Sequence, residues 1–284
     1  MNTFKPPHEP CPYCHATAEF DFSIHEKQYF QCESCDLIFH GNLQIEIERE
    51  LLQFYQHGYF LEYAQDQLSG SRNAIYSHLL DLMERETTIG KVLDVGCGCG
   101  FFLKEAKNRG WDVTGVDPSE ESIAYADKLL GPNIARKGTL EDLSQEEVYD
   151  VITMIDVLGF FSEPWADVEK ARALLKRGGL LLFRSTNGLL HSTLFKMAVT
   201  FKMDPLTNNL FVFHKYPLTP RFIRRLLGDY GFSIVLLQNA VPSKGGFFNR
   251  LLKKTVRVAV NSLYVISSGK IVIGPSLEVI ARKA

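Results

Sequence analysis

The stretch Lys91-Val-Leu-Asp-Val-Gly-Cys-Gly-Cys-Gly-Phe-Phe-Leu103 decides the fold that we expect for this chain. Val92, Leu93 and Val95 form a short apolar run, which predicts a buried parallel strand. Three glycines with one residue between them then predict a turn, and a helix is expected over 101–109. A loop of this kind brings the main chain and a helix N-terminus close to a ligand.

Two acids indicate which ligand this loop would bind. The glycine pattern is G-x-G-x-G, whereas dinucleotide-binding folds carry G-x-G-x-x-G. Asp94 lies two residues before the first glycine, where its carboxylate would repel a pyrophosphate but attract the sulfonium and ammonium of S-adenosylmethionine. Asp117 ends the next apolar strand, expected over 111–116, where an acid can accept hydrogen bonds from ribose hydroxyls. The alternative, an acid that caps an ordinary turn, leaves Asp117 unexplained.

The pattern D-x-G-x-G-x-G with an acid after the next strand resembles the class I S-adenosylmethionine-dependent methyltransferases. The resemblance covers roughly residues 71–284 and continues through Gly138-Thr-Leu-Glu-Asp-Leu143, Tyr149-Asp-Val-Ile-Thr-Met-Ile-Asp156 and Leu174-Leu-Lys-Arg-Gly-Gly179. It implies an α/β fold with a doubly wound, seven-stranded Rossmann-like sheet, whose last strand, 277–283, inserts antiparallel between the fifth and sixth. The residues expected to bind the cofactor are Asp94, Gly96, Cys97, Gly98, Asp117, Pro118, Leu140, Glu141 and Ile155.

Length and composition allow one large domain and one small module in the 284 residues. No apolar run reaches the ~18–20 residues of a membrane span, and the N-terminus lacks the apolar core of a signal peptide. We therefore expect a cytoplasmic, reducing location, where cysteines serve as ligands or packing residues rather than in disulfides.

The net charge of −2 is unevenly distributed. Residues 1–70 carry three basic and eleven acidic side chains, a balance of −8, and residues 187–284 carry fourteen basic and three acidic ones, a balance of +11. The basic region can face an anionic substrate, a membrane surface or nucleic acid, or the acidic region of the same chain.

Four cysteines near the N-terminus predict a structural zinc site. Cys11 and Cys14 form one C-x-x-C pair, and Cys32 and Cys35 form a second pair seventeen residues further along. Short strands are expected over 19–24 and 27–31, and a unit this small has no adequate core without a metal. A redox-active dithiol is the rival interpretation, but one C-x-x-C pair would suffice for it.

The two cysteine pairs with the short strands between them have the pattern of a zinc ribbon. This pattern, followed by an aromatic segment, is similar to bacterial methyltransferases with an N-terminal zinc ribbon, which often belong to sugar, lipid or polysaccharide pathways. We divide the chain into a zinc ribbon at 1–42, a linking helix and aromatic segment at 43–70, and a methyltransferase domain at 71–284. The resemblance implies Tyr59 and Tyr63 as lid residues, although tyrosines at helical spacing are also typical of a core.

Helical lid insertions are expected at about 187–216 and 243–268. Residues 247–264 combine an apolar stripe with a basic face, the pattern of a helix on a membrane surface, and residues 189–203 are similar. We favour the alternative that these helices cover the domain and line an acceptor pocket. This pocket would receive a lipid-like or anionic molecule.

The candidate proton acceptors are histidines and an aspartate. Asp156-Val-Leu-Gly-Phe160 departs from the D-V-L-E-H of relatives, and the missing Glu-His pair makes a divalent-metal mechanism unexpected. An oxygen acceptor needs a nearby base. His214 matches the first histidine of the family segment H-L-Y-H-F-S-P and is our first candidate, followed by Asp156 and His191.

The predicted function is methyl transfer from S-adenosylmethionine to an oxygen of a sugar, lipid-linked or quinone-like metabolite. Carbon or nitrogen methylation of a nucleotide sugar is the alternative. A non-catalytic cofactor-binding scaffold is disfavoured because both acids and all three glycines are present. A nucleic-acid methyltransferase would normally carry (D/N)-P-P-(Y/F) after the fourth strand, so we expect no nucleic-acid partner.

Overall fold

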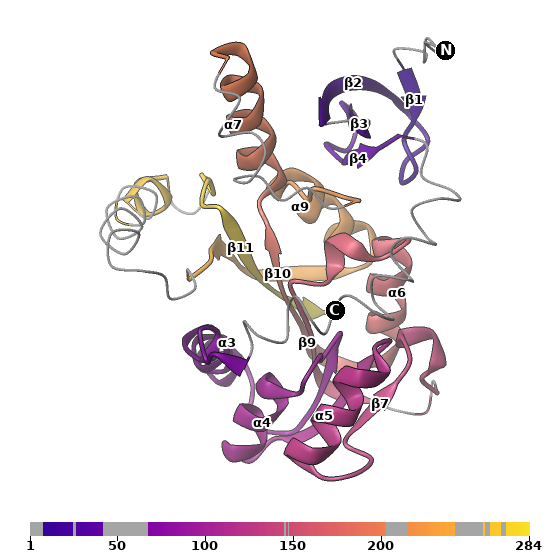
Figure 1. Ribbon diagram of the computed structural model, residues 1–284, viewed down its shortest axis with the longest axis vertical. Coiled ribbons are helices and arrows are strands. Elements are labelled where there is room, and N and C mark those ends of the chain that lie inside the picture. The colour runs from indigo at the N-terminus through magenta and orange to yellow at the C-terminus, as the bar shows by residue number, and fades with distance from the viewer. Residues whose placement is uncertain are drawn as a thin grey trace.

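A computed structural model describes residues 8–24, 27–41, 68–144, 146, 148–202, 215–241, 258, 262–267 and 271–284. Within these ranges lie a small N-terminal sheet and a larger sheet with helices on both faces (Figure 1). The expected linking helix, the aromatic segment with Tyr59 and Tyr63, His214, and most of the segment 243–268 fall outside the described residues.

The large sheet has seven strands in the order β10-β11-β9-β8-β5-β6-β7. Their bounds are β5 (Lys91–Val95), β6 (Asp112–Asp117), β7 (Ala135–Lys137), β8 (Tyr149–Ile155), β9 (Leu175–Thr186), β10 (Phe232–Asn239) and β11 (Ser276–Lys283). β5 pairs in parallel with both β6 and β8, and β11 lies antiparallel between β9 and β10. The Rossmann-like, seven-stranded sheet with its inserted last strand is therefore confirmed.

Helices cover both faces of this sheet, as a doubly wound fold requires. They are α3 (Asn73–Glu86), α4 (Phe101–Asn108), α5 (Glu120–Leu130), α6 (Pro164–Leu174), α7 (Gly188–Thr200) and α9 (Pro220–Asp229), with short 3-10 turns η2 (Leu140–Asp142) and η3 (Leu158–Phe160). Buried side chains of α3, α4 and α5 join one apolar cluster, and those of α6 and α9 join the other. The two clusters are the two cores of a three-layer domain.

Two boundaries differ from those that single residues predict: Ser71 is a residue type that caps helices, and the pair Gly178-Gly179 is typical of a helix end. Ser71 does not cap α3, because the helix begins at Asn73 after Arg72. The glycines at 178 and 179 do not end α6, because β9 already begins at Leu175. The pairing of β8 with β9 skips from Leu175 to Leu180, so the glycines occupy a bulge, where Gly178 has a φ of +75°.

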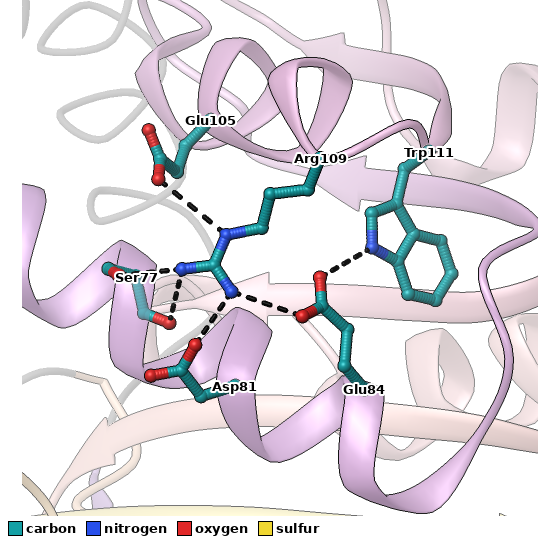
Figure 2. Close-up of polar contacts among 6 residues, drawn as sticks. All are labelled: Ser77, Asp81, Glu84, Glu105, Arg109 and Trp111. Carbon is teal, nitrogen blue, oxygen red and sulfur yellow. Dashed lines mark hydrogen bonds and ion pairs between the residues drawn. The ribbon is translucent and has the colours of Figure 1, made fainter.

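Arg109, just after α4, holds α3 in place through several polar contacts (Figure 2). Its guanidinium donates to Asp81 at 2.6 Å and Glu84 at 3.1 Å, and also to the backbone and side-chain oxygens of Ser77. The indole nitrogen of Trp111 donates to the other Glu84 oxygen at 3.2 Å. One half-buried cation thus fixes the rotation of α3 about its own axis relative to α4.

The small sheet contains β1 (His8–Pro10), β2 (Thr17–Ile24), β3 (Lys27–Cys32) and β4 (Ile38–His40) in an antiparallel order. It packs on the large domain. The Tyr13 ring lies 5.2 Å from Phe222 of α9 and 5.6 Å from Trp165 of α6, and its hydroxyl donates to Asp229 at 2.7 Å. These contacts join the small sheet to helices on one face of the large one.

A further contact of the small sheet coincides with a helix cap. The Thr219 hydroxyl accepts a hydrogen bond from the Phe222 amide at 3.0 Å, the capping role that a threonine directly before Pro220 predicts for the start of α9. The same hydroxyl donates to the Asp36 carboxylate at 2.7 Å, and Thr219 is fully buried. The N-terminus of α9 and the second cysteine pair are therefore linked through one side chain.

We expect Thr219→Val to lower the free energy of unfolding by about 1–2 kcal/mol, because it removes a helix cap and leaves a partly buried carboxylate oxygen without its donor. Urea denaturation measures this loss. Thr200→Val, at the exposed end of α7, is the matched control, and a change below about 0.5 kcal/mol is expected for it. Equal unfolding midpoints for the two variants would contradict the role of the Thr219 hydroxyl.

Candidate functional site

The loop between β5 and α4 is held tightly against β6. The amides of Gly96 and Cys97 both donate to the Val116 carbonyl, at 2.8 and 3.1 Å. Gly96 has a φ of +71°, and a Cβ at this position would lie 2.5 Å from Cγ1 of Val157. Only glycine fits there without strain or a clash. Cys97 is buried, and its sulfur packs against Gly115, where a Cβ would lie 2.7 Å from that sulfur.

The two acids expected at the site lie on either side of this loop and are buried. Asp94 and Asp117 are each 3% exposed. Asp94 accepts a hydrogen bond from the Thr153 hydroxyl at 2.7 Å. The Asp117 oxygens accept from the Gly98 amide at 2.8 Å and the Ser119 amide at 2.9 Å. The carboxylates are thus oriented by the protein before any ligand arrives.

Burial controls the protonation of both acids. It raises the pKa of Asp94 to about 7; the hydrogen bond from Thr153 and the charge of Arg72 oppose this rise, and the charge of Asp117 adds to it. Burial also raises the pKa of Asp117, against the two amide hydrogen bonds. Asp94 is therefore poised to ionise near neutral pH, when a cation can compensate its charge.

The other residues expected to bind the cofactor lie along the same edge. Ile155 is the last residue of β8 and is half-buried, and Pro118 is exposed directly after β6. Leu140 and Glu141 form η2, which follows β7. The Glu141 side chain is exposed, whereas the Leu140 side chain is fully buried and offers no surface to a ligand.

Asp156, expected as a base, is held between two arginines. It follows β8 with a φ of +60°, and both of its carboxylate oxygens lie 2.6 Å from Nη1 of Arg184 on β9. Arg72, at the start of α3, donates to it from the other side. Burial alone would raise the pKa of Asp156, but the two guanidinium charges outweigh it and hold the pKa below its ordinary value. Such a carboxylate is a poor proton acceptor.

Arg72 and Arg184 were not among the residues expected from the sequence. They lie 84 and 28 positions from Asp156, and no motif connects them. Arg184 directly follows the apolar run 180–183 of β9, and a buried charge at the end of that run is a signal that the sequence offers. Together with Asp156 they place a net positive charge at the carboxyl end of β8 and β9.

One of the two candidate histidines lies within the described residues. His191 lies on α7, and its Nε2 is 3.1 Å from the Pro275 carbonyl oxygen. Burial lowers the pKa of His191, and the contact with Pro275 opposes this. The ring joins α7 to the segment that leads into β11. His214 lies outside the described residues and stays a prediction.

The four N-terminal cysteines gather at one point of the small sheet. The sulfur of Cys11 lies 3.6 Å from that of Cys35, the sulfur of Cys14 lies 3.5 Å from that of Cys32, and all four lie within 4.8 Å of one another. A hydrogen bond from the Cys35 thiol and backbone amides lower the pKa of Cys11 to about 5, against its burial. The cluster has the number and type of ligands of a tetrahedral thiolate site.

Exposed apolar side chains mark α7 and the segment that precedes β11. They are Leu189, Leu194, Met197, Val199 and Phe201 on or next to α7, and Val258, Leu263, Val265, Ile266 and Ile271 further along the chain. Among the described residues, no helix combines the length and the apolar character that crossing a bilayer requires. These side chains form a surface of the domain.

The raised pKa of Asp94 predicts how stability depends on pH. Its folded value is about 7 against an ordinary 3.8, so the stability that it contributes is present below pH ~4 and is lost as the pH rises to about 7. We expect Asp94→Asn to flatten the pH dependence of the unfolding free energy in this window, by on the order of 1 kcal/mol per pH unit. Asp112→Asn, at the exposed start of β6, should keep the wild-type slope. Equal slopes for all three proteins, measured by urea denaturation, would contradict the shift.

Comparisons with known proteins agree with this geometry. The family described as "Methyltransferase domain" matches residues 60–237, which include the glycine loop and both acids. The chain is similar to the ubiquinone biosynthesis O-methyltransferase of Acinetobacter baumannii (strain AYE), with 32% identity over 134 residues that cover 44% of this chain and 56% of the relative. The corresponding enzyme of Actinobacillus pleuropneumoniae serotype 5b (strain L20) is 36% identical over 107 residues, 34% of this chain and 46% of the relative. The chain thus spans about half the length of the curated relatives it matches.

Solved structures show the same fold. A magnesium protoporphyrin IX methyltransferase from Synechocystis PCC 6803 with bound SAH matches with a TM-score of 0.51 and 20% identity, over 84% of this chain and 94% of that one. A SAM-dependent methyltransferase from Archaeoglobus fulgidus matches with a TM-score of 0.52 and 21% identity, over 80% of this chain and 100% of that one. With the family match over more than half of its length and the loop geometry described above, the chain belongs to the methyltransferase domain family.

Proposed function

We propose that this chain transfers the methyl group of S-adenosylmethionine to an oxygen of a small-molecule acceptor. The observation that carries the proposal is the pair of buried carboxylates, Asp94 and Asp117, on the two sides of a glycine loop at the carboxyl edge of the sheet. The name of the curated relatives, ubiquinone biosynthesis O-methyltransferase, supports oxygen as the methylated atom. A sugar, a lipid-linked molecule and a quinone-like molecule are acceptors of this kind.

The charges along the edge fit the parts of the methyl donor. Ionised Asp94 would accept hydrogen bonds from the donor's ammonium group. Each Asp117 oxygen accepts one amide hydrogen bond and has a second lone pair for a ribose hydroxyl. Arg72 is close enough to Asp94 to lower its pKa, and its guanidinium would pair with the donor's carboxylate.

The sulfonium of S-adenosylmethionine supplies the leaving group, so the protein's task is mainly to align the acceptor and exclude water. The fixed loop and the oriented carboxylates hold the donor's two ends. Asp156, Arg72 and Arg184 form an ion-paired cluster at the carboxyl ends of β8 and β9. The alignment of the acceptor would depend on this cluster, because a displacement of about 1 Å costs much of the rate.

We infer that α7 covers the acceptor. It follows β9, whose end carries Ser185 and Thr186, and it presents four apolar side chains at its surface, with Phe201 directly after it. An acceptor with an apolar part, such as a lipid-linked or quinone-like molecule, would lie against side chains of this kind. The excess of basic residues in 187–284 would favour an acceptor that also carries negative charge.

We propose that the four N-terminal cysteines bind one structural Zn²⁺. Tetrahedral coordination with Zn–S bonds of about 2.3 Å places the sulfurs ~3.8 Å apart, and the measured 3.5 and 3.6 Å are close to this value. Four thiolates fill such a site, so it has no open position for catalysis. The metal would stiffen the small sheet, which packs on α6 and α9.

The proposed function predicts that the donor binds and that its affinity depends on the acids. Isothermal titration with S-adenosylmethionine should show one site per chain, with affinity rising from pH 6 to pH 8 as Asp94 ionises. At pH 8, Asp94→Asn and Asp117→Asn should each weaken binding at least about tenfold, or ~1.4 kcal/mol. Asp112→Asn should bind as the wild type does.

Transfer itself is tested with methyl-labelled donor and a nuclease-treated metabolite extract. Label should appear in a small organic molecule, and mass spectrometry then identifies the methylated atom. A wild-type protein that binds no donor, or neutralised acids that leave its affinity unchanged, would overturn the proposal. Label that disappears after nuclease treatment would instead indicate a nucleic-acid acceptor.

The zinc proposal predicts one Zn²⁺ per chain by elemental mass spectrometry. Cys32→Ser should lose the metal and lower the midpoint of thermal unfolding by more than about 5 °C, because the small sheet depends on it. Cys99→Ser, in the glycine loop, should keep the metal and serves as the control. Purified wild-type protein without zinc, or a Cys32→Ser variant with full zinc, would exclude a four-cysteine site.

A further inference from the structure

A histidine and a glutamate that are 200 positions apart in the sequence form a hydrogen-bonded pair. Nε2 of His78, on α3, lies 3.1 Å from Oε2 of Glu278, on β11. Glu278 is 1% exposed, whereas the His78 side chain is 29% exposed. The pair therefore has a buried carboxylate behind an imidazole that reaches the surface.

Three donors fix the Glu278 carboxylate. Besides His78, the Gln238 side chain donates to it at 2.9 Å and the Val241 amide donates to it at 2.9 Å. Burial alone would raise the pKa of Glu278, but these hydrogen bonds outweigh it and the pKa is lowered. Glu278 is therefore a carboxylate at neutral pH, and its position is set by β10 and β11 rather than by the histidine.

The pair lies at the edge where the acceptor is expected. β11 runs antiparallel to β9, so its first residues lie beside the carboxyl end of β9. Glu278 is directly opposite Arg184 in this pairing, and Arg184 holds Asp156 at the end of β8. α3 begins at the same edge, because Arg72 at its start also contacts Asp156. His78 follows Arg72 by six positions on this helix.

The imidazole has the arrangement of a general base. A carboxylate that accepts from Nε2–H holds the ring in the tautomer whose Nδ1 can take a proton. Within the described chain, Nδ1 of His78 makes no hydrogen bond. Asp156, the carboxylate nearest the end of β8, is committed to Arg72 and Arg184 and cannot readily serve instead.

We propose that His78, oriented by Glu278, is the general base of the methyl transfer. This proposal rests on the proposed function. Nδ1 takes the proton of the acceptor's hydroxyl while the oxygen attacks the methyl carbon. The new O–C bond forms as the C–S bond breaks, and the bonding pair stays on sulfur, which becomes a neutral thioether. His78 is the catalytic residue in this assignment, and Glu278 is a positioning residue.

The first test uses initial rates of label transfer from methyl-labelled S-adenosylmethionine to a metabolite extract. His78→Ala should lower the rate about 100-fold, the usual contribution of a general base, with donor affinity by calorimetry within twofold of wild type. Added imidazole should restore part of the rate. Glu278→Gln should lower the rate about tenfold. Glu86→Gln, at the other end of α3, is the matched carboxylate-to-amide control and should stay within twofold.

The pH profile separates a base from a structural contact. The rates are measured at saturating donor, so that the ionisation of Asp94 does not enter through donor affinity. The wild-type rate should then show a limb that rises with pH, and this limb should be absent from His78→Ala and from His78→Asn. Glu278 is the charged group in contact with the ring. Arg72 and Asp81 belong to the same helix or its start, Arg184 and Asp156 lie at the neighbouring edge of the sheet, and the arginines do not titrate in this range. Asp156 is kept ionised by its two arginines, so it does not add a limb near neutral pH.

The outcomes distinguish this proposal from the proposed function. A wild-type protein without donor binding or label transfer overturns the function as a whole. A wild-type protein that transfers label, with a His78→Ala variant that keeps the rate within twofold, overturns the base assignment alone. So does a loss of rate that imidazole does not restore, or a pH limb that persists in His78→Asn.

Discussion

The burial of two carboxylates beside one glycine loop is the constraint on which the rest of this structure depends. Asp94 and Asp117 are almost fully enclosed, and each is oriented by protein donors. Removing such charges from water is costly unless a partner compensates them, and the raised pKa of Asp94 reflects that cost. A cationic ligand relieves it, which is why the same two residues that strain the apo site are suited to a sulfonium donor.

Several elements contribute polar residues to the edge of the sheet beyond the donor site. α3 supplies Arg72 and His78, β9 supplies Arg184, and β11 supplies Glu278. The network around Arg109 fixes α3 on its other side, so the helix cannot rotate to relax these contacts (Figure 2). The small N-terminal sheet extends this rigidity to α7, where Lys196 donates to Asp21 at 2.6 Å and Phe195 packs 5.3 Å from Phe22.

Much of the fold could be predicted because its signals are local. The alternation of apolar strands with amphipathic helices predicts the parallel sheet, and Thr219 followed by Pro220 predicts the start of α9. One boundary that failed depends on strand pairing rather than on local preference. Gly178 and Gly179 resemble a helix stop, but the bulge in β9 is set by its neighbour β8. Asp156 was expected as a candidate base after His214, from its position at the end of the fourth strand, and the sequence does not indicate the two distant arginines that bind it.

The sequence by itself determined the glycine loop, the two acids that flank it and the four cysteines of the small sheet, because each is recognised from the spacing of a few residues. Only the tertiary structure decided which charges meet across the sheet edge. His78 and Glu278 are separated by 200 positions, and Arg72 and Asp156 by 84. Such pairs arise from the order and direction of the strands, above all from the antiparallel insertion of β11. The spacing of residues along the sequence does not indicate which side chains this insertion brings together.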